Sequence, residues 1–178
     1  MDATVSAKLA AAFLAFSREK LSAQYLPRLE DCVVRLTPEQ LWWRGGSTCN
    51  SVGHLLLHLN GNVRQWILEG VGGLTVEPRR RAEEFTARQQ ESGDVVLRRL
   101  TATLREADVV LQHLSPEVLL NERQIQGHDV SVLEAVFHVV EHFSTHVGQV
   151  IFITKLLRGE DLGYYAYLDA PEPHTHKP

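Results

Sequence analysis

The longest uninterrupted helical pattern in the sequence lies between residues 131 and 159, and it constrains the fold more than any other feature. The segment from Ser131 to Glu134 reads Ser-Val-Leu-Glu. It is a capping box, in which the serine and glutamate side chains each satisfy a backbone N–H at the start of a helix. Gly159 suits the left-handed position just after a helix end. The pattern predicts one helix of about 28 residues, roughly 42 Å long. Its apolar stripe needs other long helices to cover it.

Three further segments carry apolar residues at the 3- and 4-residue spacing of a helix. They cover residues 4–36, 51–69 and 94–114. Pro27 should kink or break the first, because its ring removes one backbone donor. Residues 70–92 form the one long connection, with a short helical turn near Phe85, and residues 116–130 look irregular or extended. We therefore predict an all-α four-helix bundle over residues 1–168 as a single domain, followed by a flexible tail over residues 169–178.

Composition excludes several classes of protein. The 178 residues carry 18 Lys and Arg against 22 Asp and Glu, a net charge of −4, which argues against a nucleic-acid binder. No segment reaches the roughly 18–20 apolar residues of a membrane span. Two cysteines are too few for a disulfide scaffold, and the first residues show no basic export signal, so we expect a cytoplasmic protein with reduced thiols.

The sequence contains nine histidines, more than the average composition of proteins would supply, and five of them fall in two of the predicted helices. His138, His142 and His146 follow one another at four-residue intervals in the last helix. Their rings should line one edge of it, since each step of four residues turns by only about 40°. His54 and His58 have the same spacing in the second helix.

This spacing suits a metal site. Two imidazoles one turn apart can reach a single ion, and a third from a facing helix gives three neutral ligands that leave a coordination position free. Imidazole suits divalent ions such as Zn²⁺, Ni²⁺ or Fe²⁺. A lone His-x-x-x-His is more often a pair of hydrogen-bonded, half-buried histidines, but a second histidine-bearing helix strengthens the metal interpretation. The residues alone do not choose between His54 and His58, or decide whether His138 is a ligand or a support.

Two segments taken together resemble the DinB/YfiT-like superfamily. The first runs from Leu55 to Trp66 and the second from His138 to Gln149, and the resemblance also includes Leu41 to Arg44 and Ile125 to Gly127. The similarity is closest to a branch of small bacterial proteins of unassigned function.

The resemblance implies a four-helix bundle, commonly a homodimer, with a divalent metal held by one histidine on the second helix and two on the fourth. By position, these ligands are His58, His142 and His146. His138 then supports the pair, and His54 has a flanking or surface role. Val147 departs from the many members that carry Arg there, which would alter what the site recognises.

Two functions follow from these expectations. The first is a metal-dependent enzyme acting on a small molecule, either a thiol S-transferase that uses a low-molecular-weight thiol or a hydrolase. The alternative is a non-catalytic dimeric bundle, with a structural metal or none, that acts through partner binding. The sequence shows no general base beside the histidines. Asn62 and Gln149, one turn from predicted ligands, can orient a ligand or pack between helices. The run Arg79 to Arg81 has the composition of a solvated loop and, less often, of a site for an anionic group, while Cys49 has no basic partner nearby.

Overall fold

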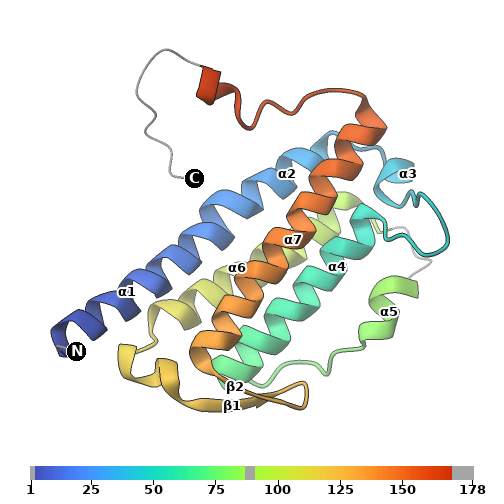
Figure 1. Ribbon diagram of the computed structural model, residues 1–178. Coiled ribbons are helices and arrows are strands. Elements are labelled where there is room, and N and C mark those ends of the chain that lie inside the picture. Colours follow the sequence, from blue (N-terminus) through green and yellow to red (C-terminus); the bar gives the residue numbers. More distant parts are fainter. Residues whose placement is uncertain (1–2, 87–90, 170–178) are drawn as a thin grey trace.

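Four long helical segments lie side by side in the computed structural model, which describes residues 3–86 and 91–169 (Figure 1). The first is α1 (Ala3–Glu19), a π-helical stretch (Lys20–Tyr25) and α2 (Leu26–Val34). The second is α4 (Val52–Val63), which continues as a π-helical stretch (Arg64–Val71). The third is α6 (Gly93–Gln112) and the fourth is α7 (Val132–Arg158). The predicted all-α bundle is confirmed.

Shorter elements connect the bundle helices. They are α3 (Pro38–Leu41), α5 (Arg81–Thr86), a 3-10 turn at Pro116–Leu120, the strands β1 (Glu122–Ile125) and β2 (His128–Ser131), and a last 3-10 turn at Ala166–Asp169. The two strands form an antiparallel hairpin in which Glu122 faces Ser131. The expectation of an extended segment near 116–130 is therefore met by a hairpin. The expected tail, apart from Asp169, lies outside the described residues.

Pro27 neither breaks nor sharply ends the first helical segment. The chain widens into a π-helical stretch just before it, where the Leu26 N–H donates to the Leu21 carbonyl, five residues back. Pro27 then sits in the first turn of α2, directly after the π-helical stretch. The predicted interruption is thus absorbed by a change of helical pitch.

Capping boxes start the helices that carry the histidines. Ser51 caps α4 and Ser131 caps α7, each accepting a bond from the backbone N–H three residues later. Gly159 ends α7 in the left-handed conformation, with φ of 67°. Both helices therefore begin where the sequence predicts, and this fixes the register of their histidines.

Helix α4 lies at the centre of the packing. It contacts α6, α7 and α5, and buries ten of its twelve residues. Thr103 of α6 donates a buried hydrogen bond of 2.8 Å to Asn60 of α4. Because α4 is covered on several sides, its polar side chains must find partners inside the protein. None of the described helices has the length and apolar character needed to cross a bilayer.

Candidate metal centre

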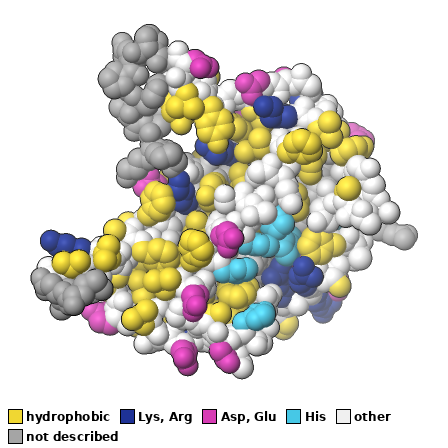
Figure 2. Space-filling view, viewed as in Figure 1, with side chains coloured by type: hydrophobic (Ala, Val, Ile, Leu, Met, Phe, Trp, Pro, Cys, Tyr) yellow, Lys and Arg dark blue, Asp and Glu magenta, His cyan; other side chains and the backbone are white. Residues whose placement is uncertain are grey.

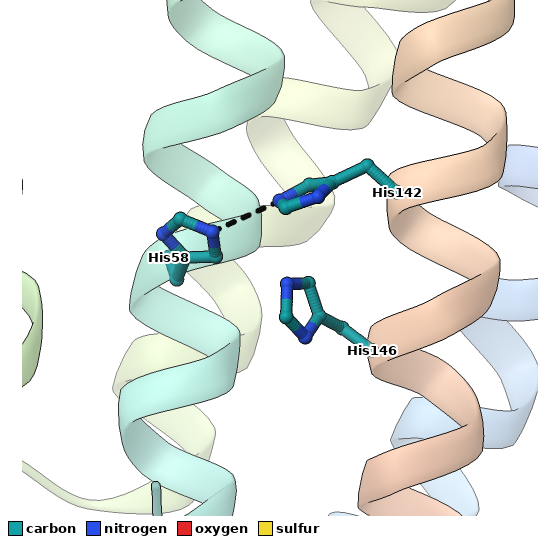
Figure 3. Close-up of side chains that lie close together, drawn as sticks. All are labelled: His58, His142 and His146. Carbon is teal, nitrogen blue, oxygen red and sulfur yellow. Dashed lines mark hydrogen bonds between the residues drawn. The ribbon is translucent and has the colours of Figure 1, made fainter.

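The structure brings the three predicted ligands together between α4 and α7 (Figure 3). His58 comes from α4 and His142 and His146 from α7, and one ring nitrogen of each lies within 4.8 Å of the others. The Nε2 atoms of His58 and His142 are 2.9 Å apart. Among the described residues, the cluster contains imidazoles alone. Three converging imidazole nitrogens suit a divalent transition metal of the Zn²⁺, Ni²⁺ or Fe²⁺ type, so these residues fit the cation that the family resemblance implies.

In two of the three rings the nitrogen that faces away from the cluster is engaged. His58 Nδ1 lies 2.9 Å from Glu84 Oε2, and His146 Nδ1 lies 2.8 Å from Gln149 Oε1. Both oxygens are acceptors, so each Nδ1 carries the proton and the lone pair of each ring is left on Nε2. Metal-binding histidines commonly donate their second N–H to such an acceptor. Gln149, which the sequence leaves open between orienting a ligand and packing between helices, is hydrogen-bonded to His146 and orients its ring.

Glu84 is in turn held by Arg79. The guanidinium Nε and Nη2 donate to the two carboxylate oxygens at 2.7 and 2.9 Å, and both side chains are nearly buried. The prediction that residues 79–81 form a solvated loop is wrong for Arg79. Its charge is paired with Glu84, because a buried guanidinium needs an anionic partner. Arg80 and Arg81 are exposed.

Burial keeps the α7 histidines neutral. Desolvation, with the fields of His146 and His58 added, lowers the pKa of His142 to about 3. Desolvation also lowers the pKa of His146, against a smaller opposing effect of its bond to Gln149. For Glu84, burial alone would raise the pKa, but the bonds from His58 and Arg79 outweigh it and lower the pKa. At neutral pH the two α7 histidines are therefore neutral and the nearby Glu84 carboxylate is ionised, protonation states that suit the binding of a cation.

His138 and His54 flank the cluster. The His138 ring stacks on His142, with centroids 5.5 Å apart, and also packs against Trp66, with centroids 4.1 Å apart. His138 therefore supports His142 by packing. His54 is buried and completes the capping box of α4, where its Nδ1 accepts a bond from the Ser51 N–H. A surface role for His54 is excluded, and a flanking role remains.

Two cavities are lined by hydrogen-bond partners of the clustered histidines. An apolar one of about 630 Å³ includes Gln149, the partner of His146, and lies between the 43–50 loop and the C-terminal half of α7. Its walls include Trp43, Cys49, Leu55, Phe152 and Leu156. A charged one of about 550 Å³ includes Arg79 and Glu84, the partners of His58. Figure 2 shows histidine side chains at the surface of the viewed face. Within the cluster, His58 is buried and His142 and His146 are half-buried.

Three further residues from the sequence analysis, Asn62, Val147 and Cys49, lie outside the histidine cluster. Asn62 is buried, and its Oδ1 has no hydrogen-bond partner among the described residues. Val147 is buried in the core, so this departure from the family pattern does not face the cavities. Cys49 is exposed and lines the apolar cavity.

Glu84 is the functional residue that sequence reasoning missed. It lies 26 residues after His58, in the six-residue α5, within a connection that carries no long periodic pattern. The only sequence signals near it are the predicted turn at Phe85, whose ring lies 4.9 Å from that of His58, and the unexplained Arg79.

Comparison with known proteins places the chain in a family. The crystal structure of a DinB-like protein from Bacillus cereus ATCC 10987 is similar, with a TM-score of 0.62 and 19% identity over 83% of this chain and 91% of that one. At this identity the likeness shows the fold, and it confirms the fold expected from the DinB/YfiT-like resemblance. No match was found among curated proteins. The profile of a family described as "Protein of unknown function (DUF1572)" matches residues 8–168, and the chain therefore belongs to this family.

Proposed function

We propose that this protein is a metal-dependent enzyme that acts on a small molecule at a divalent cation held by His58, His142 and His146. The observation that carries the proposal is the convergence of three imidazoles from two helices, with the outer nitrogens of His58 and His146 engaged by Glu84 and Gln149. Three protein ligands are typical of catalytic sites, because a fourth position stays free for water or substrate.

The chemistry of such a site follows from its ligand set. A divalent cation with neutral ligands lowers the pKa of a bound thiol or water, and so supplies a nucleophile at neutral pH. Both a thiol S-transferase and a hydrolase are compatible with this. In the transferase, the thiol loses its proton, its sulfur bonds to an electrophilic carbon, and the leaving group departs with the electron pair of the broken bond.

The two cavities bear on the substrate. The charged cavity is lined by four basic and five acidic side chains, namely Arg64, Arg79, Arg80 and Arg99 with Glu69, Glu77, Glu83, Glu84 and Glu91. Arg79 is already paired, so this cavity offers little net attraction to an anion. The apolar cavity beside Gln149 suits the hydrocarbon part of a substrate. We therefore favour a neutral electrophile or ester with an apolar group.

Metal analysis tests this proposal first. Protein purified without an affinity tag and reconstituted with Zn²⁺, Ni²⁺ or Fe²⁺ should hold one equivalent of metal, and His58→Ala should hold much less. His113→Ala is the matched control, since His113 is exposed at the end of α6. Absence of stoichiometric metal in the wild type would rule the proposal out.

Activity assays then separate the two chemistries from the alternative. The metal-loaded protein is assayed with small thiols and an aromatic electrophile, and separately with nitrophenyl esters of increasing acyl length. Turnover that is lost in His142→Ala supports the enzyme. Metal binding without turnover of any substrate in either series favours the non-catalytic bundle with a structural ion.

A further inference from the structure

Arg79 and Glu84 form a clamp on the outer edge of His58, and we infer that this clamp positions His58 for metal binding by fixing the proton on Nδ1. Glu84 is a positioning residue in this inference, and the inference rests on the proposed function. It assigns the charged segment before and within α5 to the metal centre rather than to substrate binding.

The proton on Nδ1 follows from the atoms around it. Glu84 Oε2 and Arg79 Nη2 lie 2.9 and 3.0 Å from His58 Nδ1. An ionised carboxylate can only accept, so a bare Nδ1 at 2.9 Å would set two lone pairs against each other. Arg79 Nη2 has other acceptors, Glu84 Oε2 at 2.9 Å and the His58 carbonyl at 3.4 Å. Nδ1 therefore donates to Glu84, and Nε2, which lies 2.9 Å from His142 Nε2, keeps its lone pair.

Gly61 makes the clamp sterically possible. A Cβ at this position of α4 would lie 2.2 Å from Glu84 Oε1 and 2.8 Å from Arg79 Nε. Both contacts are well below what real Cβ atoms show. The carboxylate and guanidinium therefore occupy the space that any larger residue would fill, one helical turn after His58.

The clamp is anchored on its far side as well. Arg79 Nη1 donates to Gln65 Oε1 at 3.1 Å, and Gln65 also accepts from Gln126 at the tip of the β hairpin.

Both carboxylate oxygens of Glu84 are engaged in hydrogen bonds, one with His58 and Arg79 and the other with Arg79. Glu84 is not free to act as a general base. A negative charge at this position increases the basicity of the opposite nitrogen of the ring.

Zn²⁺ affinity tests the clamp in the folded protein. Glu84→Gln keeps an acceptor of nearly the same shape and removes the charge, so the Kd for Zn²⁺, measured by competition with a chromophoric chelator, should rise about 10- to 100-fold. Glu83→Gln is the control, because Glu83 is the preceding residue, is exposed and, among the described residues, pairs with Arg80 alone. If the clamp merely stabilised the fold, Glu84→Gln would lower the free energy of unfolding and leave the Kd for Zn²⁺ unchanged.

A glycine pair tests the steric part without removing a charge. Gly61→Ala should displace the clamp and weaken Zn²⁺ binding by a similar factor. Gly148→Ala is matched to it, since Gly148 follows His146 by two residues in α7 and its Cβ would meet nothing within 4 Å. Wild-type affinity in Gly61→Ala would overturn the inference while leaving the proposed function intact.

Nitrogen-15 NMR of the metal-free protein gives a readout that needs no metal. His58 should carry its proton on Nδ1 in the wild type and should lose this preference in Gly61→Ala. A proton found on Nε2 in the wild type would overturn the inference directly. If the wild type binds no Zn²⁺ at all, the proposed function fails, and the position of this proton then decides the clamp by itself.

Discussion

His142 is half-buried in its neutral form, and this destabilises the folded protein to an extent that depends on pH. Its pKa in the folded protein is lowered to about 3, well below the ordinary value of 6.5. Between these values the unfolded chain binds a proton that the folded protein does not. The free energy of unfolding should therefore fall as the pH is lowered from about 6.5, by at most about 1.4 kcal/mol per pH unit for one such group. His146 and His138, whose pKa values are also lowered, act in the same direction.

The prediction is that the metal-free protein is less stable at pH 5.0 than at pH 7.5, and that His142→Gln reduces this difference. Urea denaturation in the presence of a chelator measures it. The range stays above the ordinary pKa of Glu, so the carboxylates with lowered pKa values contribute little. His113→Gln is the control and should keep the wild-type slope. If the free energy of unfolding depends on pH equally in the wild type and in His142→Gln, the lowered pKa of His142 is not the cause.

The sequence predicted the three clustered histidines but did not predict that Glu84 contacts His58. His58, His142 and His146 could be predicted as a cluster because four-residue spacing on a helix is read directly from the sequence. The contact of Glu84 with His58 depends on how the segment that carries Arg79 and α5 folds back onto α4. It also depends on the missing side chain of Gly61, and neither feature leaves a periodic trace in the sequence.

Helix α7 carries two of the three clustered histidines, and the capping box at its first turn contributes to its stability. Ser131 Oγ accepts from the Glu134 N–H at 3.2 Å, and the Ser131 N–H donates to Glu134 Oε2 at 2.7 Å. Ser131→Ala should lower the free energy of unfolding by about 1 kcal/mol. His142 lies about 16 Å along the helix from Ser131, at about 1.5 Å per residue, so Zn²⁺ affinity should not change.

The matched control for Ser131→Ala is Ser144→Ala, an exposed position within α7. Alanine has the higher helix propensity, so this variant should be slightly more stable than the wild type. Urea midpoints with unchanged m-values measure both. Equal stability of Ser131→Ala and wild type would show that the hairpin, rather than the capping box, fixes the start of α7.

The bounds of the bundle helices were predictable wherever a cap and an apolar stripe coincide, as at Ser51, Ser131 and Gly159. The π-helical stretches were not, because the widened turn before Pro27 and the continuation of α4 after Val63 carry no distinct residue pattern. The hairpin was expected only as extended chain. Its four-residue strands are too short for an alternating pattern to stand out.

Apolar side chains are exposed on the surface of the molecule over α1 and the N-terminal half of α7, as Figure 2 shows. Leu9, Phe16, Leu133 and Phe137 are between 37% and 58% exposed. The family resemblance implies a homodimer, which stays a prediction. A second copy of this face is its natural cover, since a two-fold dimer presents the same surface twice and exposed apolar patches commonly mark interfaces.

We predict that the protein is dimeric and that Phe137→Glu weakens the dimer at least tenfold, because an unpaired charge in an apolar interface costs several kcal/mol. Sedimentation equilibrium over a range of concentrations measures the dissociation constant. Val109→Glu introduces the same charge at an exposed apolar position of α6 and should leave the dimer intact. A monomeric wild type would reject the dimer. Equal effects of the two variants would place the interface elsewhere, because only Phe137 belongs to the α1 and α7 face.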